Sequence, residues 1–204
     1  MKLYHGTNQS SAIRICNNGI DLGFSQKYLD FGPGFYATPS YEHAAITALR
    51  KTDKINRRYH TDEDAYVVQF EYFPVKELNC ITFPRHNEKW GEFVLNNRLT
   101  PNVLFSYNIT YHNQDARYDI CIGEIADGSI VNVAYRVNAG DLLLNNVSYT
   151  QFLKESGSVY PLQYSFHSVK AVSCIKNISC DIIHNKDKYL RRINQGQKGV
   201  RRYD

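Results

Sequence analysis

The sequence predicts a single α+β domain. Helical patterns concentrate in the first half of the 204 residues, strand patterns concentrate in the second half, and the chain shows no internal repeat. A doubly wound parallel sheet is built from repeated strand–helix–strand units, so their absence argues against that class. Residues 1–184 are therefore assigned to one domain and residues 185–204 to a basic C-terminal tail.

The chain begins with a predicted strand and a predicted helix. Residues 2–5 have a short strand pattern, and either Asn8 or Ser10 can cap a helix that continues through Cys16. The Asn18-Gly19 pair suits the left-handed geometry that ends many helices. We therefore expect the first helix to stop there.

A second helix is predicted over residues 39–51. Thr38 can cap it, with Pro39 at the first helical position, where a missing N–H costs nothing. The apolar residues recur every three or four positions and form one stripe, made of Tyr41, Ala44, Ala45, Ala48 and Leu49.

Further along, one strand and one helix have clear patterns. Apolar and polar residues alternate over residues 65–73, which predicts a half-buried strand. Residues 88–98 place Trp90 and Phe93 on one helical face, and both are expected to belong to the core.

The second half is predicted to be rich in strands. Residues 117–125 and 129–137 flank Asp127-Gly128, a dipeptide that favours a tight hairpin, so these two segments are predicted to pair. Residues 162–168 and 171–178 are two further candidate strands.

The composition favours a soluble chain. Charged residues make up 22% and hydrophobic residues 43%, which is ordinary for a globular protein. No apolar run approaches the roughly 20 residues that cross a bilayer, and the start lacks the apolar region of a signal peptide. We expect a cytoplasmic protein with no membrane partner.

Cysteine and histidine usage argues against metal binding. The five cysteines are an odd number without a Cys-x-x-Cys pair, which also argues against a disulfide framework. The seven histidines lack a pair at metal-ligand spacing with an acidic neighbour. Buried free thiols and no metal site are expected.

Positive charge concentrates in the tail. Residues 185–204 contain seven Lys or Arg against two Asp, whereas the whole chain has a net charge of +4. Such a tail can bind nucleic acid or an acidic partner. A solvated C-terminal end is an equally good interpretation.

Three segments carry residues suited to binding a flat polar ligand. A His5-Gly6 pair leaves the first strand, and glycine lets a ligand approach the backbone closely. Residues 31–38 (FGPGFYAT) form a constrained corner that presents an aromatic face. Gln163, on a late strand, offers a hydrogen-bonding side chain.

Taken together, these motifs resemble the ADP-ribosyltransferase superfamily. The resemblance is to its His-Tyr-Glu branch, which includes the poly(ADP-ribose) polymerases and diphtheria toxin. His5-Gly6, the Phe31-Gly32-Pro33-Gly34-Phe35-Tyr36 corner and Ala44-Ala45 match that branch, and Gln163-Tyr164 matches the position of its glutamate. Over roughly residues 2–176 the chain also resembles an uncharacterised bacterial family in that superfamily, some of whose relatives belong to toxin–antitoxin pairs.

The resemblance implies a fold, a substrate and a set of roles. The fold would be an ADP-ribosyltransferase-like split β-sandwich of two antiparallel sheets with flanking helices, and NAD would be the substrate. His5 would hold a ribose hydroxyl, Gly6 would pin the nicotinamide amide, Tyr36 would stack on the ring, and Gln163 would complete the catalytic set. The other NAD contacts it implies are Thr7, Gly34, Phe35, Ala44 and Arg98.

The implied activity is mono-ADP-ribosylation of a protein or nucleic-acid acceptor with release of nicotinamide, in a toxin with an antitoxin partner.

Two positions depart from the pattern of the His-Tyr-Glu branch. Gln163 cannot take a proton or carry charge, so transfer needs either an acceptor that is already nucleophilic or another base. The candidates for that base are Glu124, Asp127 and Glu155. The second stacking aromatic falls at Thr47, for which Tyr41 is a possible substitute.

Other interpretations remain open from the sequence. Gln163 favours an inactive protein that binds NAD or ADP-ribose, and water as the acceptor would make a glycohydrolase. RNA 2′-phosphotransferases share the fold and the His-Gly-Thr start, but they need several arginines, and only Arg14 and Arg98 lie in suitable segments. Arg98 fits a structural ion pair as well as a phosphate contact.

Overall fold

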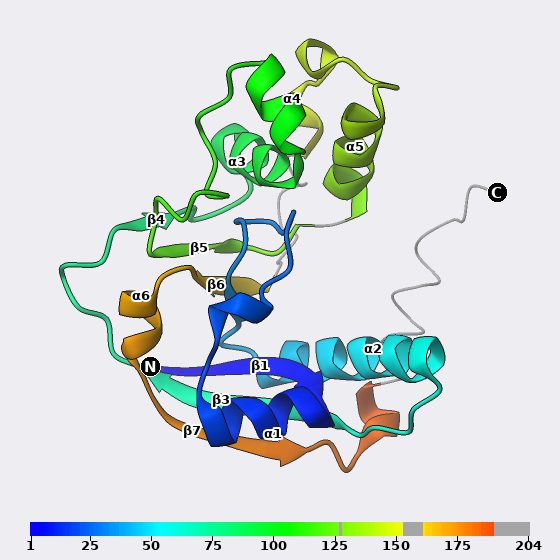
Figure 1. Cartoon of the computed structure of the whole chain (residues 1–204), viewed down its shortest axis with the longest axis vertical. Helices are drawn as coiled ribbons and strands as arrows, with labels where there is room; N and C mark the ends of the chain where they lie inside the picture. Colours follow the sequence, from blue (N-terminus) through cyan, green and yellow to red (C-terminus); the bar gives the residue numbers. More distant parts are fainter. Residues whose placement is uncertain (127, 153–160, 190–204) are drawn as a thin grey trace. The chain divides into compact units, whose positions relative to one another are not determined.

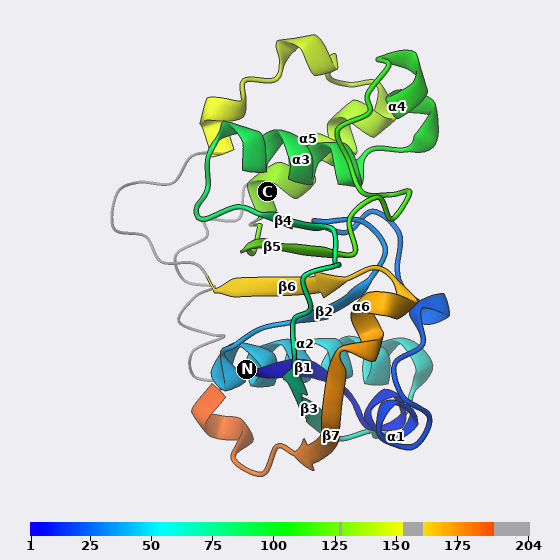
Figure 2. The same cartoon turned by 90° about the vertical axis from the view of Figure 1, so that its left-hand side faces the viewer.

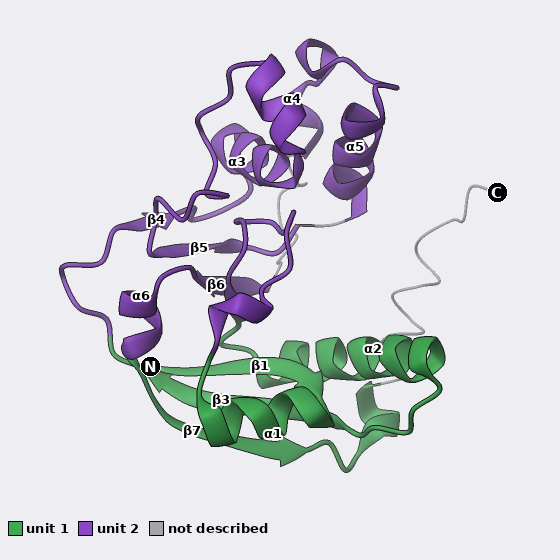
Figure 3. Ribbon diagram, viewed as in Figure 1, with its two compact units in different colours: residues 1–20, 37–73, 175–204 green, residues 21–36, 74–174 purple. Residues whose placement is uncertain are grey.

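The computed structural model describes residues 1–126, 128–152 and 161–189 (Figure 1). It confirms an α+β protein with two sheets. The chain divides into two compact units, coloured separately in Figure 3. Unit 1 contains residues 1–20, 37–73 and 175–204, and unit 2 contains residues 21–36 and 74–174.

Unit 1 is a three-stranded antiparallel sheet with two helices. The strand order is β1-β3-β7, so β1 is an edge strand. The bounds are β1 Lys2–Asn8, α1 Gln9–Asn18, α2 Tyr41–Tyr59, β3 Ala65–Tyr72 and β7 Ile175–Ile182. Figures 1 and 2 show α1 and α2 on opposite faces of this sheet.

The residues of β3 explain why both faces are covered. Val67 packs with the alanines of α2. The next residue, Val68, points to the other face because successive strand side chains alternate, and it is fully buried. The predicted strand over residues 65–73 is confirmed.

The second helix begins and ends later than the sequence predicts. Ser40, rather than Thr38, is the cap, with its hydroxyl accepting a hydrogen bond from His43 N at 3.1 Å. Thr38 instead exchanges two backbone hydrogen bonds with Tyr4, at 2.8 and 2.9 Å, which hold it in extended conformation. The predicted stripe is confirmed in that Ala44, Ala45, Ala48 and Leu49 are buried and Tyr41 packs against them.

The first strand is longer than predicted. Its pairing with β3 continues to Asn8, opposite Ala65, so His5 and Gly6 lie within β1 and not at its end. The first helix ends at Asn18 with Gly19 at φ 81°, as predicted.

Unit 2 contains the second sheet, with strand order β2-β6-β5-β4. Its strands are β2 Phe35–Ala37, β4 Cys80–Thr82, β5 Ile120–Glu124 and β6 Leu162–Phe166. The expectation of two antiparallel sheets is wrong here, because β4 pairs parallel with β5 whereas β5 and β6 are antiparallel. A parallel pair needs a long crossover, which here includes α3 Glu88–Arg98 and α4 Pro101–Ser106.

One predicted hairpin is a strand followed by a helix. Residues 120–124 form β5, but the segment assigned to its partner forms α5 Gly128–Ala139. Ile130, Ala134 and Val137 are its buried residues, at spacings of four and three, so the helical period decides over the β-branched composition. The predicted strand over residues 171–178 is also only partly a strand. Its first residues belong to α6 Val169–Ser173, and its last residues belong to β7.

The core of unit 2 is formed by helices packed with aromatic loop and strand residues. Trp90 and Phe93 of α3 are 1% and 0% exposed, which confirms both as core. Phe31 is also fully buried and stacks with Phe83 at 6.0 Å between ring centroids. Three short 3-10 helices complete the described elements: η1 Leu22–Phe24, η2 Leu144–Asn146 and η3 Tyr149–Phe152.

All five cysteines are free thiols. Cys121 and Cys174 are buried as predicted, but Cys80 is exposed and Cys16 and Cys180 are half-buried. Among the described residues, no helix has both the length and the apolar character to span a membrane.

Candidate functional site

The corner between Asp30 and Ala37 owes its shape to two glycines. Gly32 has φ 86°, and a Cβ there would lie 2.5 Å from the carbonyl oxygen of Asn113. A Cβ on Gly34 would lie 2.6 Å from Nδ1 of His167. Other residues therefore cannot follow the same path, and the chain enters β2 in a fixed direction.

Tyr36 is tied to this corner by its hydroxyl group. The hydroxyl accepts a hydrogen bond from Phe31 N at 2.9 Å and donates one to the Gly32 carbonyl at 2.7 Å. Burial, together with the Asp30 carboxylate nearby, raises the pKa of Tyr36 well above its usual value. The hydroxyl therefore stays protonated, and the half-buried ring is held at one end.

Phe35 and Tyr36 have different surroundings on β2. Phe35 is buried and its ring lies 6.4 Å from that of Phe166 on β6, so it belongs to the packing of unit 2. Tyr36 meets the ring of His167 edge-on, with centroids 6.3 Å apart.

His167 is a site residue that the sequence reasoning missed. Its Nδ1 donates to the Pro33 carbonyl at 2.7 Å, and its Nε2 lies 2.8 Å from the hydroxyl of Ser165. Burial lowers the pKa of His167 to about 4, so the imidazole is neutral near pH 7. From the sequence, His167 is only a histidine near the end of the candidate strand over residues 162–168.

Gln163 and Arg98 meet at one buried carboxylate. Asp30 is 6% exposed and Gln163 is 7% exposed, and Gln163 Nε2 donates to Oδ2 of Asp30 at 2.8 Å. Arg98 forms an ion pair with Oδ1 of Asp30, its Nε donating at 2.9 Å. The backbone N–H of Ala126 donates to Oδ2 at 3.2 Å.

This geometry gives Arg98 the structural ion pair that the sequence left open as an alternative to a phosphate contact. Asp30 itself was not singled out from the sequence, although it directly precedes the FGPG turn. Its partners follow it by 68 and 133 positions, a separation at which sequence patterns carry no signal.

The residues predicted from the start of the chain lie in unit 1. His5 is half-buried on β1 opposite Val68, and Gly6 is opposite Val67. The hydroxyl of Thr7 is buried and accepts a hydrogen bond from Lys51 Nζ at 3.0 Å.

The backbone of Gly6 faces the outer edge of the sheet. Tyr4 uses its N–H and C=O to bond Thr38, on the side away from β3. Backbone groups alternate along a strand, so the N–H and C=O of Gly6 point the same way as those of Tyr4. Ala44 lies beneath Gly6, since a Cβ on this glycine would be 1.9 Å from the Ala44 carbonyl oxygen.

The remaining candidates are scattered. Glu124 ends β5, and its carboxylate lies 3.4 Å from Nε2 of His86, while Asp127 and Glu155 lie outside the described residues. Thr47 is exposed on α2. Tyr41 meets Tyr4 edge-on at 5.4 Å, as a member of the apolar stripe. No set of three potential metal ligands occurs within residues 1–126, 128–152 and 161–189.

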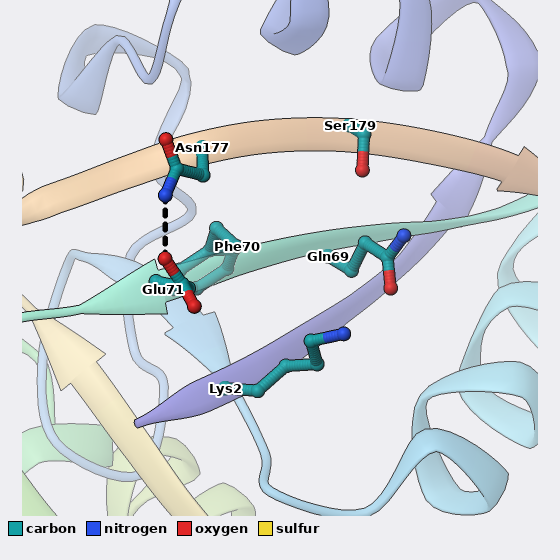
Figure 4. Close-up of a pocket in the computed structure, with 6 residues that line it drawn as sticks. All are labelled: Lys2, Gln69, Phe70, Glu71, Asn177 and Ser179. Atoms are coloured by element: carbon teal, nitrogen blue, oxygen red, sulfur yellow. Dashed lines mark hydrogen bonds between the residues drawn. The ribbon is translucent and has the colours of Figure 1, made fainter.

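A separate hollow of about 220 Å³ lies on the sheet of unit 1 (Figure 4). It is lined by Lys2, Gln69, Phe70, Glu71, Asn177 and Ser179. Asn177 Nδ2 donates to Glu71 at 2.5 Å across it. None of the residues predicted from the motifs lines this hollow.

A protein-family model described as "Protein of unknown function (DUF3990)" matches residues 1–177. The chain belongs to this family. The match includes β1, the corner, the Asp30–Arg98–Gln163 cluster and His167. No curated protein and no solved structure matches the chain.

Proposed function

We propose that this DUF3990 member is a mono-ADP-ribosyltransferase with the split β-sandwich of that superfamily. It would transfer one ADP-ribose from NAD to a protein or nucleic acid and release nicotinamide. The observation that carries the proposal is the hydrogen bond between Gln163 and Asp30. This bond joins the strand that bears the glutamine to the corner that bears Tyr36, two motifs for which the resemblance assigns a common role.

The proposed reaction breaks the bond between C1′ of the ribose and the nicotinamide nitrogen. Nicotinamide leaves with the bonding electron pair, and an oxygen or nitrogen of the acceptor bonds C1′ and loses its proton. The transition state has oxocarbenium character, so the protein contributes mainly orientation and electrostatic stabilisation.

Each proposed role has a matching feature. The ring of Tyr36, fixed through its hydroxyl, offers a face for the nicotinamide ring. The outward N–H of Gly6 can donate to the oxygen of a carboxamide, and its C=O can accept from the amide NH₂ group. His5 would hold a ribose hydroxyl, by the resemblance. By the same resemblance, the protein would act as a toxin with an antitoxin partner.

Mass spectrometry of the purified protein with NAD tests the proposal directly. We expect free nicotinamide, and an adduct of one ADP-ribose when cell lysate or nucleic acid is added. Free nicotinamide without any adduct would identify a glycohydrolase, and NAD binding without turnover would identify an inactive relative.

Tyr36 variants test the proposed stacking. Tyr36→Ala is expected to lower nicotinamide release about a hundredfold, equal to ~3 kcal/mol in the barrier. Tyr36→Phe keeps the ring but loses both hydrogen bonds to the corner, so its activity should fall less while its unfolding midpoint also falls. Tyr135→Ala, at a 70% exposed tyrosine of α5, is the matched control. Full activity in Tyr36→Ala would contradict the assignment.

A further inference from the structure

Four donors surround the carboxylate of Asp30. Arg98 approaches Oδ1 through Nε and Nη2, and Oδ2 accepts from Ala126 N and Gln163 Nε2. A carboxylate in an ion pair can only accept hydrogen bonds. Its neighbours must therefore present N–H groups, and Gln163 must point its NH₂ group toward Asp30.

The orientation of the Gln163 amide follows from this chemistry. An amide side chain has a donor end and an acceptor end, and rotation by half a turn exchanges them. With Nε2 held by Asp30, Oε1 is directed elsewhere, and no hydrogen bond from another described residue reaches it. Because the bond joins two buried groups, the exchanged orientation would set two acceptors against each other.

We propose that Asp30, held by Arg98, is a positioning residue that fixes the Gln163 amide so that Oε1 accepts a hydrogen bond from a ribose hydroxyl of NAD. This inference rests on the proposed function and deepens it. The carboxylate polarises the amide through the hydrogen bond, which makes Oε1 a stronger acceptor.

The same pair explains why position 163 is glutamine. A glutamate there would bring a second carboxylate to hydrogen-bond distance of Asp30 in a buried setting. Two carboxylates so placed cannot both be ionised, and one must hold a proton. Glutamine removes this conflict and keeps an oxygen acceptor.

A double-mutant cycle tests the contact without requiring activity. The variants are Asp30→Asn, Gln163→Glu and the combined D30N/Q163E, which restores one donor amide facing one carboxylate. Each single variant is expected to lower the unfolding midpoint at pH 7. The combined variant should unfold at a higher temperature than the Gln163→Glu protein, because the facing carboxylates are gone. If the loss of unfolding midpoint in the combined variant equals the sum of the losses in the two single variants, the inference is overturned.

Kinetics of nicotinamide release test the positioning role. Asp30→Asn frees the Gln163 amide to turn, so kcat should fall about tenfold or more while KM changes less than about threefold. Gln163→Glu should show a similar loss, with partial recovery in the combined variant. Exposed residues of unit 2 supply the controls, Asp141→Asn and Gln151→Glu, which should leave both constants unchanged.

The two readouts separate the possible failures. A coupled cycle with unchanged kcat in Asp30→Asn would overturn the positioning role while leaving the proposed function intact. If the cycle shows coupling but the wild-type protein neither binds nor cleaves NAD, the proposed function is refuted, and the role of Asp30 toward NAD is refuted with it.

Discussion

Gly6→Ala is expected to lower the free energy of unfolding by about 3 kcal/mol or more, at the upper end of overpacking effects. A Cβ at this position would lie 1.9 Å from the carbonyl oxygen of Ala44 and 2.7 Å from the backbone nitrogen of Ala48. Both contacts are with helix backbone, which cannot rotate away as a side chain can. The helix α2 would have to separate from β1, with loss of the alanine packing between them.

Chemical denaturation monitored by circular dichroism measures this effect. Gly128→Ala is the matched control, because a Cβ there meets no atom within 4 Å. A Gly6→Ala protein as stable as the control would show that α2 does not pack this closely on β1.

The second large effect is a loss of stability in mild acid through His167. Burial lowers the pKa of His167 to about 4, from an ordinary value near 6.5. Between these values the unfolded chain binds a proton that the folded protein excludes, so stability falls as the pH falls. The contribution of neutral His167 to the free energy of unfolding is complete above pH 6.5. It decreases by about 3 kcal/mol as the pH falls to 4.

His167→Asn should weaken this pH dependence. The side-chain NH₂ of asparagine can still donate a hydrogen bond to the Pro33 carbonyl, but asparagine has no titrating group. We expect the variant to be less stable than wild type at pH 7 and to lose less stability between pH 6.5 and 4. His60→Asn, at an exposed residue after α2, is the control substitution of the same type. An unchanged slope in His167→Asn would refute the assignment.

Local patterns predicted much of the fold. The stripe of α2, the alternation of β3 and the Asn18-Gly19 helix end are properties of neighbouring residues, and each is present in the structure. The prediction for residues 129–137 failed because the segment fits both periods: Val131, Val133 and Val137 lie at even spacings, as in a strand, whereas Ile130, Ala134 and Val137 are spaced by four and three, as in a helix. The burial of Ile130, Ala134 and Val137 resolves that ambiguity in favour of a helix.

The candidate site was predicted only in part. The motifs singled out Tyr36 and Gln163. The side chains that contact them across the unit, His167 and Asp30 respectively, are recognisable only through contacts distant in sequence. The parallel pairing of β4 with β5 likewise depends on how a crossover packs, which no local pattern encodes.

The shared carboxylate of Asp30 also constrains how this site can change in evolution. Replacing Gln163 alone by glutamate places two carboxylates against each other. Replacing Asp30 alone leaves the guanidinium of Arg98 without its carboxylate partner. Each single step is costly, so a relative with glutamate at the position of Gln163 is expected to differ at the position of Asp30 as well. Across relatives, the residues at these three positions should therefore vary together.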